Sequence, residues 1–171
     1  QRLDKSFYER DVLDVAPALL GSYLTLRSDN GKINRYMITE TEAYRGEADK
    51  ACHACRGRTA RTEIMYSSGG HIYIYLINGM YWMFNIVTSK PEIPQAVLIR
   101  GLGGYAEAGK MTKELIIDKS YYGINLINSS KIWIEASNKE IKYITTPRIG
   151  VDYAESPWRD RKWRFIKSDQ G

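Results

Sequence analysis

The sequence contains little cysteine and little histidine, with two residues of each among 171. Both cysteines lie in "CHAC", Cys52 to Cys55, with His53 between them, and the other histidine is His71. A zinc site needs four ligands, or three and a water, and no second cysteine pair is present to complete one. No strand-and-helix context typical of a redox motif surrounds the pair. We therefore interpret both thiols as incidental and expect neither a metal nor a cofactor.

Long hydrophobic runs are also absent. No apolar stretch approaches the length of a membrane-spanning helix, and the polar start "QRLDKSFYERD" lacks the apolar core of a signal peptide. These features predict a protein without a membrane partner that is soluble and intracellular: cytoplasmic and nucleoid-associated in a bacterium, or nuclear in a eukaryote. A length of 171 residues suits one domain, 1–171, with its own core, and a monomer is the default expectation.

Motifs for nucleotide binding and for a serine nucleophile are missing as well. No Walker sequence and no Gly-x-Ser-x-Gly elbow occurs, and "GLGG" at Gly101 opens no clear helix. The formal net charge of +5 favours a polyanionic partner only weakly. Phenylalanine is scarce, with 3 residues against 13 Tyr and 4 Trp. Tyr and Trp combine a stacking face with a polar tip, which suits base-binding sites, although half-buried strand positions explain most of them.

Hydrophobic periodicity predicts an α+β domain with an antiparallel sheet. The apolar spacing is helical over 11–20 and 110–118, and the segment 47–70 is polar, basic and irregular. Alternation predicts strands at 23–27, 32–44, 71–77, 78–87, 96–100, 131–136, 141–144, 148–153 and 163–166. Asn30-Gly31 marks a tight turn between the first two strands. Strands joined mostly by hairpins, with few helices, favour the α+β class.

The stretch "ITETEAYRG", Ile38 to Gly46, places two carboxylates near the end of a strand. Successive strand residues alternate between faces, so Glu40, Glu42 and Tyr44 should point the same way. A carboxylate there could be a general base, a metal ligand or an ion-pair partner. For Glu40 we expect a structural ion pair or a helix-cap contact.

Five stretches carry a resemblance to a known family. They are "ETEAYRGEADKACHACRGRTARTEIMY" (Glu40 to Tyr66), "GGHIYIYLINGMYWMFNI" (Gly69 to Ile86), "AVLIRGL" (Ala96 to Leu102), "GKMTKELIID" (Gly109 to Asp118) and "RIGVDYAESPWRDRKWRFI" (Arg148 to Ile166). In this order they are similar to the 3-methyladenine (alkyladenine) DNA glycosylases over nearly the whole chain. The resemblance implies a curved antiparallel sheet with surrounding helices, like the C-terminal domain of a tRNA formyltransferase.

The resemblance also implies an activity. Such enzymes flip a damaged purine out of duplex DNA, because a stacked base is unreachable, and hydrolyse its N-glycosidic bond. The implied lesions are 3-methyladenine, 7-methylguanine, hypoxanthine and ethenoadenine, and the partner is double-stranded DNA. No lysine occupies a motif position that would suggest Schiff-base chemistry, so we expect a monofunctional enzyme that leaves an intact abasic site for base excision repair.

Residue roles follow from the same resemblance. Glu42 matches the general base that deprotonates the attacking water, Arg100 matches an arginine that orients this water, and the backbone carbonyl of Val151 matches its third partner. Three residues match those that sandwich the flipped base, namely Tyr44, His53 and Tyr75, and the backbone N–H of His53 would read the purine 6-position. Asn85 matches a residue that crowds the purine 2-position and so disfavours guanine.

The implied DNA-contacting residues lie in three places. The basic loop that meets the backbone consists of Arg56, Arg58, Thr59 and Arg61, and Gly109 with Lys110 matches a loop that opens a helix toward phosphate. The family usually has a wedge tyrosine where this sequence has Asn78. An aromatic wedge replaces lost stacking, and Met80 and Tyr81 could supply part of it.

Two alternatives remain open, the first because of Asn78 and the second because the implied fold resembles a domain appended to a tRNA formyltransferase. One is a non-catalytic binder of damaged DNA, and the other is an RNA- or tRNA-binding module. Retention of Glu42, Arg100, Tyr44 and Asn85 together favours the enzyme, because a binder has no need to position a water. Preference for RNA over DNA of the same sequence would identify the last alternative.

Overall fold

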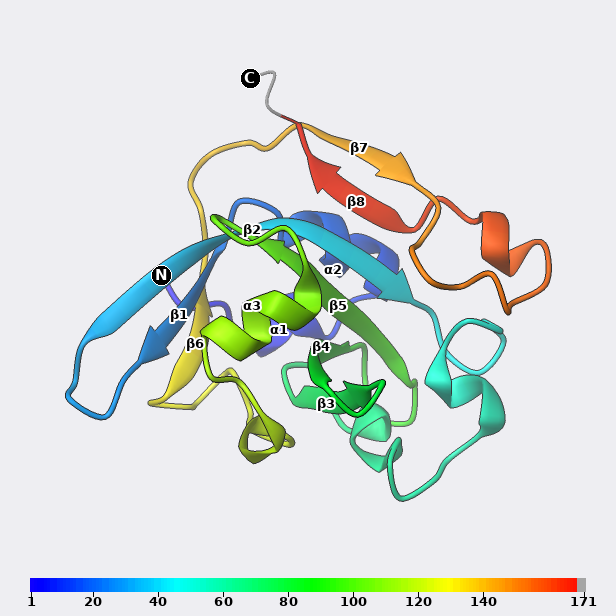
Figure 1. Cartoon of the computed structure of the whole chain (residues 1–171), viewed down its shortest axis with the longest axis horizontal. Coiled ribbons are helices and arrows are strands. Elements are labelled where there is room, and N and C mark those ends of the chain that lie inside the picture. Colours follow the sequence, from blue (N-terminus) through cyan, green and yellow to red (C-terminus); the bar gives the residue numbers. More distant parts are fainter. Residues whose placement is uncertain (169–171) are drawn as a thin grey trace.

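The computed structural model describes residues 1–168 and shows a curled antiparallel sheet with a few short helices (Figure 1). The strands are β1 (Tyr23–Arg27), β2 (Ile33–Tyr44), β3 (Ile72–Ile77), β4 (Tyr81–Thr88), β5 (Gln95–Leu102), β6 (Ile132–Glu135), β7 (Tyr143–Thr146) and β8 (Arg164–Lys167). The α-helices are α1 (Lys5–Tyr8), α2 (Val12–Ala18) and α3 (Ala108–Glu114). Four 3₁₀ turns complete these elements: His53–Arg56, Glu63–Tyr66, Lys119–Tyr121 and Trp158–Asp160. None of the helices within 1–168 has the length and apolar character needed to cross a membrane.

The long strand β2 organises the sheet. The order is β3-β4-β5-β2-β1-β6, and β8 pairs with β2 and with β7. The first half of β2 pairs with β1, while its second half lies between β5 and β8. This change of partners along one strand curls the sheet, as the cyan ribbon in Figure 1 shows. The end of β2 is therefore held from both sides.

The two faces of the sheet beside β5 carry different residues. Alternation turns Val97 and Ile99 toward the main core, where they pack with Val15 and other apolar residues of α2. Leu98 lies on the opposite face and packs with Met83 of β4 and Ala108 of α3. In Figure 1, α2 lies behind the sheet and α3 in front of it. The face under α3 carries the cavity described below.

The predicted fold class is confirmed, and most predicted strands are present. The helix predicted over 110–118 is instead Ala108–Glu114, since Ile116 has a positive φ of 57° that ends the helical path. Strand β5 extends to Leu102, beyond the strand predicted over 96–100. The strand predicted over 148–153 is wrong: this segment is a loop, in which Gly150 has a φ of 74° that interrupts the extended backbone.

Candidate active site

A cavity of about 650 Å³ opens on the face of the sheet that α3 covers. Side chains of β2, β3, β4, β5 and α3 line it, together with the loops 51–61 and 149–153. A volume of this size suits a ligand such as one nucleobase with its sugar. Apolar side chains and a few polar groups share the lining, so the cavity can hold a flat, partly polar ring.

The strand register explains why these residues meet. Residues directly opposite each other form a row across four strands: Glu42, Leu98, Asn85 and Tyr73. Directly opposed residues in a ladder share a face, so positions far apart in the chain point into one cavity. Tyr44 faces Ala96 in the next row, and this small side chain leaves room beside the tyrosine ring.

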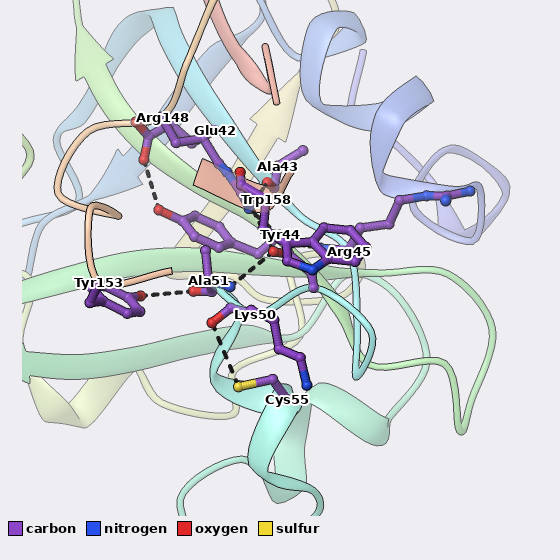
Figure 2. Close-up of polar contacts among 11 residues, drawn as sticks. Glu42, Ala43, Tyr44, Arg45, Lys50, Ala51, Cys55, Arg148, Tyr153 and Trp158 are labelled. Carbon is purple, nitrogen blue, oxygen red and sulfur yellow. Dashed lines mark hydrogen bonds and ion pairs between the residues drawn. The ribbon is translucent and has the colours of Figure 1, made fainter. Parts of the chain in front are cut away.

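Glu42 is fully buried and accepts two hydrogen bonds. The Tyr44 hydroxyl donates to Oε1 at 2.9 Å, and the Ile149 backbone N–H donates to Oε2 at 2.7 Å. Figure 2 shows the Tyr44 hydroxyl meeting this carboxylate. Glu42 is not itself a lining residue, but its three partners Tyr44, Ile149 and Arg100 are. A carboxylate has about four acceptor positions, so Glu42 can accept further hydrogen bonds, including those from a water.

Arg100 reaches Glu42 from a break in the sheet register. Glu40 faces Gly101 and Thr41 faces Ile99, so Arg100 is an extra residue on β5. Such bulges re-aim side chains and are frequent beside active sites. Arg100 Nε lies 3.1 Å from Glu42 Oε2 as an ion pair, yet this atom has no hydrogen-bond partner. Arg100 lines the cavity, and its guanidinium places a positive charge next to the buried carboxylate.

Val151 completes the group predicted to surround the water. Its side chain is buried beside Ala51 and Ala154, and the residue lines the cavity. Its carbonyl already accepts a hydrogen bond of 2.9 Å from the Ala154 N–H, and a carbonyl oxygen can accept a second one. The structure thus brings Glu42 and Arg100 together and places Val151 on the cavity wall, two residues after the Ile149 N–H that contacts Glu42.

The three aromatic residues predicted to sandwich a base line the same cavity. Tyr44 lies on β2 and Tyr75 on β3. Strands β5 and β4 lie between these two, so β2 and β3 are separated by three inter-strand spacings of about 4.8 Å each. His53 packs edge-on against Tyr75 with ring centroids 4.4 Å apart. Burial and the Glu42 charge raise the pKa of Tyr44, and burial raises that of Tyr75. Both hydroxyls therefore stay protonated and can donate.

Asn85 is buried and forms part of the cavity wall. Its Nδ2 donates to the backbone carbonyls of Tyr73 and Met83, each at 3.3 Å. These contacts fix the amide against β3 and β4, so it cannot swing out of the way of a ligand. A fixed polar group at this depth suits discrimination between purines by shape.

His53 should remain neutral down to acidic pH. Burial, and then the charges of Arg61 and Arg56, lower its pKa to about 4. Between about pH 6.5 and pH 4 the unfolded chain therefore binds a proton that the folded chain does not, so stability falls as the pH is lowered. We expect the His53 ring to titrate near pH 4 in an NMR experiment, and the thermal midpoint of His53→Gln to fall less than that of the wild type. Titration near 6.5 would contradict the buried placement.

The three predicted wedge residues lie in and beside the β3–β4 hairpin turn. Asn78 and Gly79 have φ values of 52° and 66°, as a type I′ turn requires, and Asn-Gly is the favoured pair there. Met80 follows and is 67 % exposed. Tyr81 packs close to Gly109, where an added Cβ would lie 2.7 Å from the tyrosine ring. Of the three, Met80 presents an apolar side chain to solvent.

The predicted basic loop contains residues in different situations. Arg56 and Arg61 are exposed, and Arg61 lies over the Tyr75 ring at 5.3 Å, at the cavity. Arg58 instead pairs with Glu63 and Glu92, each at 2.7 Å, so its charge is largely compensated. Thr59 exchanges hydrogen bonds with Thr62 and so shapes the loop. Arg56 and Arg61 are thus better placed than Arg58 to meet a phosphate.

Gly109 and Lys110 lie within the first turn of α3 rather than in a loop before it. Gly109 allows the close contact with Tyr81, because a side chain at this position would collide with the tyrosine ring. Lys110 is exposed and pairs with Glu107 at 3.4 Å. Such exposed pairs contribute little, so the lysine is available to an anion at the cavity mouth.

Glu40 lies outside this cavity. Arg164 of β8 contacts its carboxylate through two guanidinium nitrogens, which confirms the structural ion pair expected for this residue.

Within residues 1–168, no group of three or more His, Cys, Asp or Glu side chains could hold a metal ion. Cys52 is buried, and burial raises the pKa of its thiol to about 12.

Sequence reasoning missed the part of the site that the loop 148–153 contributes through Ile149 and Tyr153. The Ile149 N–H contacts Glu42, and Tyr153 lines the cavity while its hydroxyl donates to the Ala51 carbonyl at 3.0 Å (Figure 2). A backbone N–H leaves no mark in a sequence, and the alternating apolar residues of this loop favoured a strand. Gly150 was the available signal for a turn.

A family model described as methylpurine-DNA glycosylase (MPG) matches residues 6–108 and 105–171. The chain belongs to the methylpurine-DNA glycosylase family. This glycosylase is therefore an enzyme that hydrolyses N-glycosyl bonds in DNA, and it acts in DNA repair.

Curated relatives agree with this membership. A protein of Natranaerobius thermophilus, named "Putative 3-methyladenine DNA glycosylase", is 38 % identical over 192 aligned positions that cover 98 % of this chain and 96 % of the relative. A protein of Sodalis glossinidius with the same name is 42 % identical and covers 95 % of each chain. One of Methanocella arvoryzae, also with this name, is 39 % identical over 95 % of this glycosylase and 90 % of the relative.

Proposed function

We propose that this protein excises alkylated and deaminated purines from double-stranded DNA as a monofunctional glycosylase. The proposed substrates are 3-methyladenine, 7-methylguanine, hypoxanthine and ethenoadenine. The enzyme would act as a monomer with one catalytic domain over 1–171, in the compartment that holds the chromosome. The product would be the free base and an intact abasic site.

The strongest support for this proposal is the position of the Glu42 carboxylate. The buried carboxylate of Glu42 lies beside an aromatic cavity, within hydrogen-bond or ion-pair distance of the lining residues Tyr44, Ile149 and Arg100. A water held by Glu42, Arg100 and the Val151 carbonyl would attack the anomeric sugar carbon as the bond to the base breaks. Glu42 would take the proton from this water, and its charge would stabilise the positive sugar that develops.

The same cavity would select the base. A flipped purine would stack between Tyr44 on one side and Tyr75 with His53 on the other. The fixed amide of Asn85 would crowd the 2-amino group of guanine, which adenine-like rings and hypoxanthine lack. 7-Methylguanine keeps this amino group, but its ring is positively charged and therefore leaves the sugar more easily than normal guanine. Lesions weaken stacking or pairing and so cost less to flip, which adds selectivity before the base enters.

Met80 is proposed as the residue that enters the gap left by the flipped base. Its exposed side chain follows the Asn78-Gly79 turn, and apolar wedges of this kind offset unstacking. We expect Met80→Ala to weaken binding to a hypoxanthine duplex by about tenfold, since unstacking costs a few kcal/mol per step, while binding to single-stranded DNA is unchanged. Ile116→Ala, at another exposed apolar residue, serves as the control. Equal loss of duplex and single-strand binding would contradict the wedge.

Base release from a panel of substrates tests the function as a whole. Methylated duplex DNA and duplexes with one hypoxanthine or ethenoadenine would be incubated with the protein, and free bases separated by chromatography. Release of 3-methyladenine together with at least one deaminated or etheno base supports the proposal. Tight binding with no base released from any substrate would refute it and favour a non-catalytic binder.

A further inference from the structure

Arg148 is a fully buried arginine that joins separate parts of the site. Its guanidinium pairs with the equally buried Asp49, through Nη1 at 2.6 Å and Nη2 at 3.0 Å. Nη1 also donates to the Ala43 carbonyl at 3.0 Å, and Nη2 to the Trp158 carbonyl at 3.1 Å. One side chain thus ties the end of β2 to the loops around residues 49 and 158.

The guanidinium also contacts aromatic faces. Arg148 lies over the rings of Tyr44 at 4.9 Å and Trp163 at 5.0 Å. Tyr44 is the cavity residue whose hydroxyl donates to Glu42. A cation stacked on a ring restricts its position, so Arg148 supports Tyr44 on the side away from a bound base.

The residues that follow Arg148 provide the contacts near the proposed water. Ile149 gives its N–H to Glu42 and Val151 is predicted to offer its carbonyl. At the other end of the loop, the Tyr153 hydroxyl donates to the Ala51 carbonyl. The Ala51 N–H in turn donates to Asp49 at 3.0 Å. The loop 148–153 is therefore attached at both ends to the segment 49–51, as Figure 2 shows for Tyr153 and Ala51.

We infer that Arg148, with Tyr153 at the other end of the loop, is a positioning residue for base excision. The two hold the Ile149 N–H and the Val151 carbonyl at the distance from Glu42 that water attack requires, and Arg148 fixes the Tyr44 ring. This inference rests on the proposed function. A site that holds its reacting groups within a fraction of an ångström loses rate when such support is removed.

Three variants separate positioning from stability. Arg148→Lys keeps the positive charge. It loses the paired hydrogen bonds from the guanidinium to Asp49 and the stacking of the guanidinium on the Tyr44 and Trp163 rings. The double variant Asp49→Asn with Arg148→Met removes both buried charges, so it leaves no unpaired ion to unfold the chain. Tyr153→Phe removes one hydroxyl from a residue that is 70 % exposed and should not affect folding. Arg164→Lys is the matched control, since it alters an arginine–carboxylate pair outside the cavity.

The experiment measures single-turnover excision of hypoxanthine from a labelled duplex with enzyme in excess. Thermal midpoints and affinities for a duplex with an abasic analogue are recorded alongside. We expect at least tenfold slower excision for both Arg148 variants and about threefold for Tyr153→Phe, with affinity within threefold of the wild type and Arg164→Lys unaffected. Wild-type rates in the folded double variant, or in Tyr153→Phe, would overturn the inference. If the proposed function fails, the wild type itself releases no base. If only the inference about Arg148 and Tyr153 fails, the wild type and the variants excise the base at the same rate.

Discussion

Glu42→Gln should lower the single-turnover rate of base excision by about 10²–10⁴-fold, the usual contribution of a general base. The amide has nearly the shape of the carboxylate and can still accept a hydrogen bond from Ile149, but it cannot take a proton from water. The fold should persist, because Gln places no charge in a fully buried position. Excision kinetics on a hypoxanthine duplex, with thermal unfolding alongside, test this expectation.

Glu40→Gln is the control for this variant. Glu40 lies two residues away on β2, but its partner is Arg164 and it does not line the cavity. We expect its excision rate to stay within threefold of the wild type. A rate within tenfold of the wild type for Glu42→Gln would show that another group activates the water.

Arg100→Met should slow excision by about 10–100-fold, which corresponds to the 1.5–3 kcal/mol typical of a hydrogen bond to a charged group. The variant removes the cation that lies 3.1 Å from Glu42. It should also lower the free energy of unfolding, because it leaves a buried carboxylate without its counter-charge. That loss should be below the roughly 3–5 kcal/mol of a fully buried pair, because the Arg100 side chain is 15 % exposed.

A double-mutant cycle separates the two effects of Arg100. In Glu42→Gln with Arg100→Met neither charge remains, so the stability lost in Arg100→Met should largely return, while excision stays slow. Residues in direct contact show this kind of coupling. Additive losses of stability in the double variant would contradict a direct ion pair between the two side chains.

Strand alternation was sufficient to predict part of the site. It placed Glu42 and Tyr44 on one face, and the hydrogen bond between them confirms this. The antiparallel class followed from short alternating segments and the Asn30-Gly31 turn. Such features are local, because they depend on neighbours a few residues apart.

The remaining features depend on distant partners. Arg100 is aimed by a bulge that arises from the register between β5 and β2, and no local pattern marks it. Arg148 and Asp49 are separated by 99 positions, so their pairing exists only once the loops meet. The alternation of Ile149, Val151 and Tyr153 favoured a strand, while the positive φ of Gly150 produces a loop. The contact of that loop with Glu42 comes from a backbone group, the Ile149 N–H, rather than from a side chain.

Asn78 shows how a departure from a family pattern can have a local reason. The sequence suggested a weakened wedge at this position. The structure shows a turn residue with positive φ, for which asparagine is among the best choices. The exposed apolar side chain is instead Met80, two positions later.

The role of Glu42 in base excision is tested most sharply by strand cleavage of an end-labelled duplex with one hypoxanthine or ethenoadenine. Wild type and Glu42→Gln would be compared with and without alkali, which cuts at abasic sites. If Glu42 activates the water, alkali-dependent cleavage occurs with the wild type only, and the variant still binds the lesion. Absence of alkali-labile product from the wild type on these lesions and on methylated DNA, despite tight binding, would contradict this role.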